Sequence, residues 1–151
     1  MAELKRRRGA LERPITEKQF WEVDVRVRYA DTDQMGVAYH GSYMVWFEIG
    51  RTELCRSKGF AYLDLEQMGY RLMITDLRCR YRKAVRYDDV ITIRTWVEEF
   101  RKRMMTFGYR ILCQETGEIA ASGETRHVCL DILSGRPRTL PESFRQALNH
   151  S

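Results

Sequence analysis

The sequence predicts an α+β fold in which one long central helix is wrapped by a curved antiparallel β-sheet. Three observations predict this fold. Segments of alternating apolar and polar residues, typical of strands, make up most of the chain. A single long helical segment follows the first of them, and the later segments are joined by connections short enough for hairpins, without strand–helix–strand alternation. The 151 residues, 44% of them hydrophobic, are sufficient for one globular domain with a core of its own.

The first strand is expected at residues 20–29, which read FWEVDVRVRY. Val23, Val25, Val27 and Tyr29 alternate with charged residues, so this strand has one buried face and one solvent face. The turn-forming residues at positions 31–36 end the alternation and therefore the strand.

The long helix is expected at residues 43–58, with Gly59 as its C-terminal stop. Its first half is apolar on nearly every side, which indicates a helix enclosed by protein rather than laid on a surface. Gly50 lies inside this helix, where glycine costs about 1 kcal/mol relative to alanine. We therefore expect another backbone to approach the helix closely at this point.

Four longer strands follow, at residues 71–83, 89–99, 103–115 and 118–131. Alternation predicts that each of the first three presents one apolar face. The residues expected to share these faces are Met73, Thr75, Leu77, Cys79 and Tyr81; Ile91, Ile93, Thr95 and Val97; and Met105, Phe107, Tyr109, Ile111 and Cys113. A short helix is expected at residues 141–149, with Pro141 in its first turn.

The charge distribution separates a tail from the domain. The formal net charge is +5, but residues 1–13 alone carry +3, so the rest of the chain is only slightly basic. We interpret residues 1–17 as a basic, flexible tail and residues 18–151 as a single domain, and we expect no nucleic-acid partner. No stretch of eighteen apolar residues occurs, so no membrane span is expected.

Cysteine and histidine positions argue against disulfides and metals. The four cysteines are widely spaced and contain no CxxC pair, which is typical of reduced thiols in the cytoplasm. The three histidines show no metal-ligand spacing either, so no metal site is expected. His127, which alternation places beside Thr125 and Cys129, is expected to be a packed structural residue.

One segment carries a dense motif. Residues 29–43 read YADTDQMGVAYHGSY, and the helix continues with E-x-x-R-T-E-L at residues 48–54. This pattern resembles the hotdog-fold 4-hydroxybenzoyl-CoA thioesterase superfamily, and within it the YbgC-type acyl-CoA thioesterases. The resemblance spans residues 23–133. It implies a hotdog fold and an acyl-CoA substrate, or an acyl carrier protein thioester. It also implies no cofactor beyond the coenzyme A of the substrate, and a homodimer that assembles to a homotetramer with its sites at the subunit pairing.

Thioester hydrolysis needs a group that attacks the acyl carbon or deprotonates water, and a donor for the oxyanion that forms. The resemblance implies that Asp33 is the catalytic carboxylate, as nucleophile or as general base, and that the backbone amide of His40 stabilises the oxyanion. The His40 side chain could also contact substrate or position water. The alternative is that Asp31 and Asp33 merely bond their own turn; for Asp31 we expect that bracing role.

The remaining candidates concern substrate binding. The resemblance implies that Tyr29, Gly36, Tyr39, Tyr43 and Glu48 lie at the substrate site, and that Arg101, Lys102 and Arg103 bind the phosphates of coenzyme A. Tyr43 could instead belong to the core. Glu48, expected to be buried, could instead pair with Arg51 or Thr52 one turn on. The basic triplet could be a solvated hairpin turn, and strand alternation would let two of its three side chains reach one ligand.

Two other functions remain as alternatives. A hotdog hydratase or dehydratase would use aspartate and histidine differently, and no hydratase-type motif is visible. A non-catalytic acyl- or nucleotide-binding module could recruit the basic tail and Arg101–Arg103 to nucleic acid, but the interleaved aromatic and basic residues that single-strand binding uses are not visible.

Overall fold

The computed structural model describes residues 19–149, so the predicted tail at residues 1–17 lies outside the described residues. The elements in chain order are β1 (Phe20–Arg26), the 3-10 turn η1 (Tyr29–Asp31), α2 (Ser42–Ser57), α3 (Tyr62–Gln67), β2 (Tyr70–Tyr81), β3 (Val90–Phe100), β4 (Met104–Cys113), β5 (Ile119–Asp131) and α4 (Glu142–Asn149).

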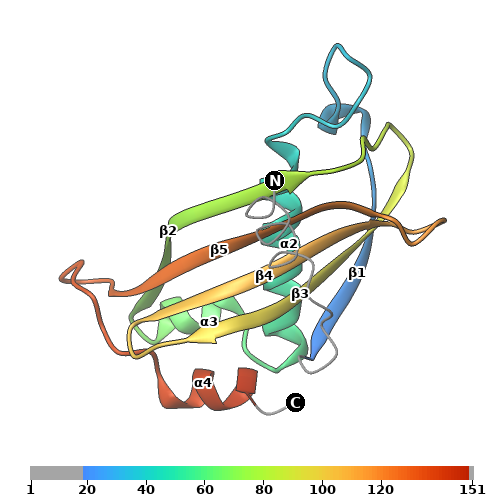
Figure 1. Cartoon of the computed structure of the whole chain (residues 1–151). Coiled ribbons are helices and arrows are strands. Elements are labelled where there is room, and N and C mark those ends of the chain that lie inside the picture. Colours follow the sequence, from blue (N-terminus) through green and yellow to red (C-terminus); the bar gives the residue numbers. More distant parts are fainter. Residues whose placement is uncertain (1–18, 150–151) are drawn as a thin grey trace, which may run out of the picture.

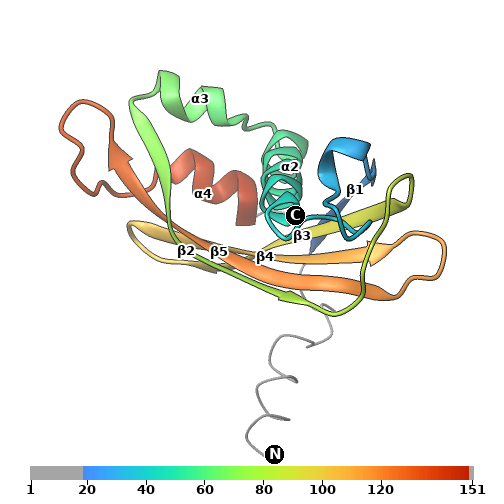
Figure 2. The ribbon, with the colours of Figure 1, turned by 90° about the horizontal axis from the view of Figure 1, so that it is seen from above.

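The five strands form one antiparallel sheet in the order β1-β3-β4-β5-β2 (Figure 1). Seen along the sheet, α2, α3 and α4 all lie on the same face, and the sheet curves around the long helix α2 (Figure 2). This arrangement confirms the predicted α+β fold of one long helix wrapped by a curved antiparallel sheet.

The core lies between α2 and the inner face of the sheet. The strand residues that alternation predicts to face inward are buried there, among them Ile91 and Ile93 of β3 and Phe107 and Tyr109 of β4. Phe47 of α2 stacks on Tyr109 with a ring-centroid distance of 4.2 Å. The apolar side chains of both layers are thus removed from water, which is the main favourable contribution to folding.

Gly50 lies at the closest approach of α2 to the sheet. A Cβ at this position would lie 2.8 Å from Ile93 Cγ2 and closer still to Thr95 Oγ1. The sheet does approach the helix closely at this point, but the expectation of another backbone is wrong, because the nearest atoms belong to side chains of β3. The predicted stop is also correct: Gly59 has φ +80°, and its N–H donates to the carbonyl of Arg56 at 3.0 Å.

The first predicted strand is too long. β1 ends at Arg26, and residues 29–31 form a 3-10 turn because Asp31 bonds back to Arg28. Tyr29 therefore does not continue the buried face with Val27, and its side chain is 79% exposed. The prediction that Tyr29 shares the buried face is wrong.

The predicted face of β2 is also wrong at its start, because a β-bulge lies between Ile74 and Asp76. After the bulge, Leu77 pairs with the inward residue Thr125, as predicted; before it, Met73 pairs with Val128, on the outer face. The helix α3 was not predicted at all, since its six residues are too few for a periodic pattern.

β2 is an open edge of the sheet. This twelve-residue strand pairs with β5 on one side and with no described strand on the other. The apolar side chains of Met73, Ile74, Leu77 and Tyr81 are 39–48% exposed. The outward side of α2 is open as well, with Val45 47% exposed. A long, apolar, unpaired edge is a surface on which another strand can pair. Over the described residues, no helix is both long and apolar enough to cross a membrane.

Candidate active site

The loop between β1 and α2 is organised around Asp31. This carboxylate is 5% exposed, accepts a hydrogen bond from the N–H of Arg28 at 2.8 Å and pairs with the Arg28 guanidinium at 2.9 Å. Partial burial alone would raise the pKa of Asp31, but its bonds to Arg28 outweigh burial and hold the pKa below its ordinary value. The Asp31 carbonyl accepts the N–H of Tyr39 and the hydroxyl of Ser42, each at 2.8 Å. The expected bracing role of Asp31 is confirmed.

Asp33 lies in a tight turn within this loop. Its Oδ1 accepts the N–H of Met35 at 2.9 Å, and its carbonyl accepts the N–H of Gly36 at 3.0 Å. Gly36 has φ +78°, a conformation that glycine adopts without strain. The Asp33 side chain is half-buried, and within residues 19–149 its Oδ2 accepts no hydrogen bond. The turn thus holds the carboxylate by one oxygen and leaves the second oxygen available.

The amide of His40 lies just before the first turn of α2. On one side of it, the N–H of Tyr39 donates to Asp31; on the other, the N–H of Ser42 donates to the carbonyl of Tyr39 at 2.9 Å. Among the described residues, no acceptor takes the N–H of His40. The His40 carbonyl accepts the hydroxyl of Tyr81 at 2.8 Å. An amide without an internal partner at a helix N-terminus is suited to bind an anionic oxygen.

Aromatic residues surround this point, at different depths. Tyr43 is 3% exposed and packs edge-on against Trp46 and Tyr81, at 4.7 and 4.8 Å between centroids. Burial raises the pKa of Tyr43 to about 12. Tyr39 is exposed and lies against the exposed ring of His40 at 4.1 Å. Tyr43 is therefore a core residue beneath the helix mouth, whereas Tyr39 faces solvent.

Tyr29 and Gly36 also lie on the solvent side of the loop. The ring of Tyr29 packs edge-on against Tyr87 at 5.8 Å. Tyr29, Asp33, Gly36, Tyr39 and His40 thus all lie on the loop that leads from β1 into α2, and Tyr43 lies in the first turn of α2.

Glu48 does not occupy the position that its sequence context indicates. Its side chain is exposed on α2, so the expectation of a buried charge is wrong. Arg51 lies one helical turn after Glu48. Burial alone would lower the pKa of Arg51, but its interactions with Tyr109, Tyr62 and the Glu48 carboxylate raise this pKa above the ordinary value. Glu48 thus interacts with Arg51 electrostatically from the open side of the helix.

His127 is the packed structural residue that was expected. It is 1% exposed, and its Nε2 lies 2.8 Å from Thr125 Oγ1. Burial and the nearby Arg51 lower its pKa to about 3, so the ring is neutral at physiological pH.

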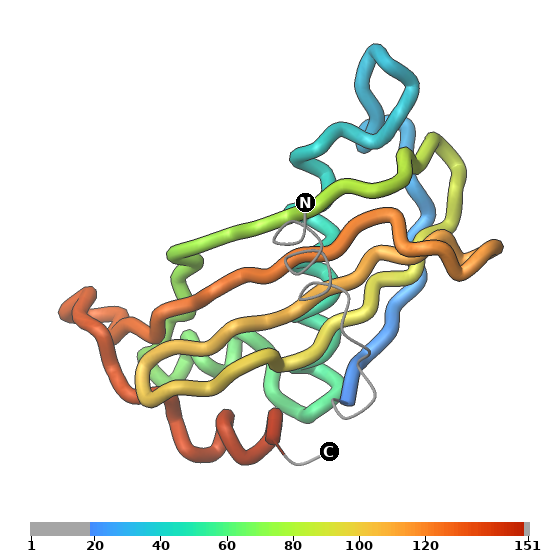
Figure 3. The backbone as a smooth tube through the Cα atoms, viewed as in Figure 1, coloured from blue at the N-terminus to red at the C-terminus, as the bar shows by residue number. Residues whose placement is uncertain are grey.

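The basic triplet and the loop that holds Asp33 lie at opposite ends of the sheet (Figure 3). Arg101, Lys102 and Arg103 form the exposed turn between β3 and β4, whereas the loop with Asp33 adjoins the start of β3, where the N–H of Val27 donates to Asp89. The eleven residues of β3 span about 33 Å. One subunit therefore does not bring the triplet and Asp33 together.

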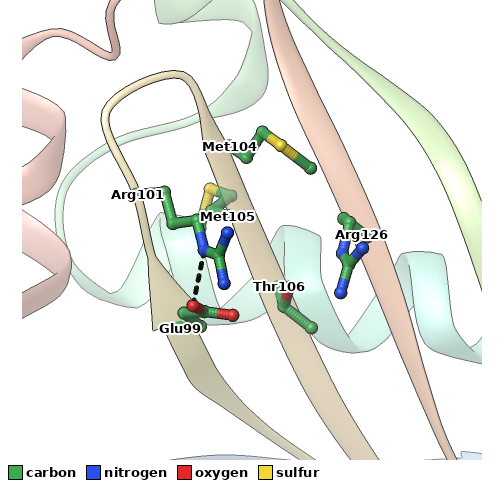
Figure 4. A pocket seen from close by; sticks show the side chains of 6 residues that line it. All are labelled: Glu99, Arg101, Met104, Met105, Thr106 and Arg126. Atoms are coloured by element: carbon green, nitrogen blue, oxygen red, sulfur yellow. Dashed lines mark hydrogen bonds and ion pairs between the residues drawn. The ribbon is translucent and has the colours of Figure 1, made fainter.

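Beside the triplet, a small hollow on the outer face of the sheet is lined by one more basic side chain (Figure 4). Arg101 and Arg126 both line it, and the Arg101 guanidinium pairs with Glu99 at 2.7 Å. Arg126 was not among the predicted site residues, although alternation along β5 puts it on the outer face, opposite Thr106. Residues 19–149 contain no group of three or more histidine, cysteine, aspartate or glutamate side chains placed to hold a metal ion.

Known proteins resemble this chain in sequence and in fold. A profile of the Thioesterase-like superfamily matches residues 27–148. YneP of Bacillus subtilis is 36% identical over 121 residues, which cover 80% of this chain and 87% of YneP. Acyl-CoA thioester hydrolase YbgC of Escherichia coli is 34% identical over 120 residues, which cover 80% of this chain and 89% of YbgC. Among solved structures, DHNA-CoA thioesterase from Staphylococcus aureus superposes with a TM-score of 0.82 at 32% identity, over 86% of this chain and 89% of that chain.

Proposed function

This chain belongs to the Thioesterase-like superfamily, and from that membership we propose that it hydrolyses acyl-CoA thioesters to free coenzyme A and a carboxylic acid. Over the matched region it is similar both to an acyl-CoA thioester hydrolase and to a CoA thioesterase of known structure. It is a thioesterase, and the reaction needs no group beyond the protein, the substrate and water.

The observation that carries the mechanism is that one loop, leading into α2, presents both an available carboxylate oxygen and an amide without an internal acceptor. Asp33 Oδ2 has no hydrogen-bond partner, and neither does the N–H of His40, within the described part of the chain. The loop that holds both is braced at Asp31 by hydrogen bonds and an ion pair to Arg28, Tyr39 and Ser42. A braced loop keeps the two groups in place before substrate arrives.

In this mechanism the Asp33 carboxylate attacks the acyl carbon or takes a proton from the attacking water. The carbonyl oxygen then becomes negative and is bound by the N–H of His40, supported by the partial positive charge at the N-terminus of α2. The C–S bond breaks, and coenzyme A leaves as the thiolate. If Asp33 is the nucleophile, water then hydrolyses the acyl–aspartyl anhydride and restores the carboxylate.

Substrate contacts are proposed for the residues around this mouth. Tyr29, Gly36 and Tyr39 would meet the thioester end from the loop. Tyr43 would support them from below, and Glu48 would line the open side of α2. An acyl carrier protein could present the same thioester. The four free cysteines suit a reducing compartment, and we propose the cytoplasm.

The position of the basic triplet supports a dimeric site. Arg101, Lys102 and Arg103 lie about 33 Å along β3 from the Asp33 end of their own subunit. If two copies pair antiparallel along the exposed β2 edge, the Tyr70 end of one strand adjoins the Tyr81 end of the other. The partner's basic turn then lies at the end of the sheet that holds Asp33. There this turn, together with the Arg126 beside it, can bind the phosphates of coenzyme A. Such dimers could pair further into a tetramer.

The catalytic proposal is tested by a free-thiol assay with a panel of aliphatic and aromatic acyl-CoAs. We expect turnover by the natural chain and a loss in kcat of about 10²–10⁴-fold for Asp33→Asn. The matched control is Asp24→Asn, an exposed acid on β1 bonded to Thr92, which should keep full activity. No turnover by the natural chain despite binding of coenzyme A would favour a binding module instead.

The shared site is tested by complementation. Asp33→Asn and a variant with Arg101, Lys102 and Arg103 all replaced by alanine should each be nearly inactive. After subunit exchange, a mixed dimer contains one site with an intact Asp33 and an intact basic turn. About a quarter of the wild-type activity should return for random pairing. If mixing restores nothing while mixed dimers form, the basic turn and Asp33 do not share a site across subunits.

A further inference from the structure

We propose that Tyr81 is a positioning residue that fixes the backbone around the oxyanion-binding amide; this inference rests on the proposed function. Tyr81 lies at the C-terminal end of the edge strand β2, and its hydroxyl donates to the carbonyl of His40 at 2.8 Å. The two residues are 41 positions apart in the sequence. This bond therefore joins the sheet directly to the loop in front of α2.

The direction of the His40 N–H depends on the geometry of consecutive peptide groups. A peptide group is planar and trans, so a hydrogen bond to its carbonyl also fixes the direction of its N–H. The N–H of His40 belongs to the peptide group between Tyr39 and His40, whose carbonyl accepts the N–H of Ser42 at 2.9 Å. The preceding group is held by the bond from the N–H of Tyr39 to Asp31, at 2.8 Å, and the following group is held by Tyr81. The His40 amide is thus fixed from both sides, while no described residue accepts its own hydrogen.

Without the Tyr81 hydroxyl, the bonds from Ser42 and to Asp31 remain, but no described hydrogen bond holds the peptide group between His40 and Gly41. That group could then rotate and strain the peptide group beside it, so that the His40 N–H is held less firmly in its direction. An oxyanion donor acts through its direction as well as its presence, because it must point at the charge that develops in the transition state. We therefore expect Tyr81 to affect the chemical step more than substrate binding.

Tyr81 is itself held in place, which it must be to position something else. Its backbone pairs with Ala121 of β5, and its ring packs edge-on against Tyr43 at 4.8 Å with an interplanar angle of 88°. Tyr43 is in turn buried against Trp46. The hydroxyl remains a donor throughout the working pH range, because desolvation and the neighbouring Cys79 raise the pKa of Tyr81 above its ordinary value.

Tyr81→Phe tests the inference, since it keeps the ring and removes only the hydroxyl. We expect kcat to fall about tenfold, less than the loss of a whole oxyanion donor, with KM within twofold of wild type. The shape of the pH profile should be unchanged, because the residue exchanges no proton with substrate. The control is Tyr87→Phe, an exposed tyrosine beside the same loop, which should leave kcat unchanged.

A second measurement reports the backbone itself. Amide hydrogen exchange of residues 37–44 should be faster in Tyr81→Phe than in wild type, whereas residues 104–113 of the central strand β4 should be unchanged. Wild-type kcat and wild-type exchange in the variant would overturn the inference. So would a raised KM at unchanged kcat, because that would make Tyr81 a substrate contact.

The outcome also separates this inference from the proposed function. If wild type hydrolyses acyl-CoA and Asp33→Asn does not, but Tyr81→Phe equals wild type, the positioning role fails and the thioesterase mechanism stands. If wild type releases no thiol from any acyl-CoA, the proposed function fails first and the positioning role fails with it.

Discussion

Replacing Gly50 by alanine should destabilise the domain, although alanine is the better helix former. Gly50 lies in the middle of α2, directly over β3. The added Cβ would lie 2.8 Å from Ile93 Cγ2 and nearer still to Thr95 Oγ1. Ordinary contacts between such atoms are about 3.5–4.0 Å, so the overlap with Ile93 alone is about 0.7 Å or more.

The magnitude follows from two opposing effects. Alanine gains about 1 kcal/mol of helix propensity relative to glycine. Overpacking a core typically costs about 1–3 kcal/mol, and this site should lie near the upper end because Ile93 and Thr95 are both fully buried in the second strand of the sheet. The net loss is then about 2 kcal/mol, which lowers the Tm of a domain of this size by about 4–8 °C.

The assay is thermal and urea unfolding at one fixed protein concentration, because association would also shift the Tm. Thr52→Ala on the same helix is the control and should change little. The double variant Gly50→Ala/Thr95→Ala removes the closest atom, so its loss should be smaller than the sum of the single losses by about 1 kcal/mol. If Gly50→Ala is as stable as wild type or more stable, α2 does not approach β3 as closely as described.

Three further predictions follow from the buried polar groups. Burial lowers the pKa of His127 from an ordinary 6.5 to about 3, so between these pH values the unfolded chain binds one proton more than the folded chain. The free energy of unfolding should therefore decrease as the pH falls through this window. Urea unfolding from pH 4 to 7 should show a smaller pH dependence of this free energy in His127→Gln. Burial raises the pKa of Cys55 to about 12 and that of Cys129 to about 11. Iodoacetamide at pH 8 should therefore modify neither thiol in the native protein but both thiols in urea, as measured by mass spectrometry. Modification of either thiol in the native protein at the rate of a free thiol would contradict their burial. Burial would raise the pKa of Asp31, but Arg28 lowers it below the ordinary 3.8, so the ionised carboxylate stabilises the folded state at neutral pH and this stabilisation is lost as the pH falls below 3.8. Asp31→Asn should reduce the free energy of unfolding by about 1–3 kcal/mol at pH 7 and should also reduce kcat. An unchanged Tm would show that this bracing is not needed.

Patterns within short stretches of sequence predicted much of this protein. Alternation placed Ile91, Ile93 and Thr95 on the inner face of β3, and the apolar run with Gly59 located α2. These features depend on the period of the backbone and on local turn chemistry, so neighbouring residues suffice to predict them. The motif around Asp33 was likewise readable, because its parts lie on one continuous loop.

Other features depend on which segments meet, and only the tertiary structure decided them. The bulge at Ile74 to Asp76 reverses a face of β2 because of its register with β5. The exposure of Glu48 follows from which side of α2 meets the sheet. The bond from Tyr81 to His40, and the distance between Arg101 and Asp33, follow from strand order. Contacts between distant segments are set by topology and packing, which leave no periodic signal in the sequence.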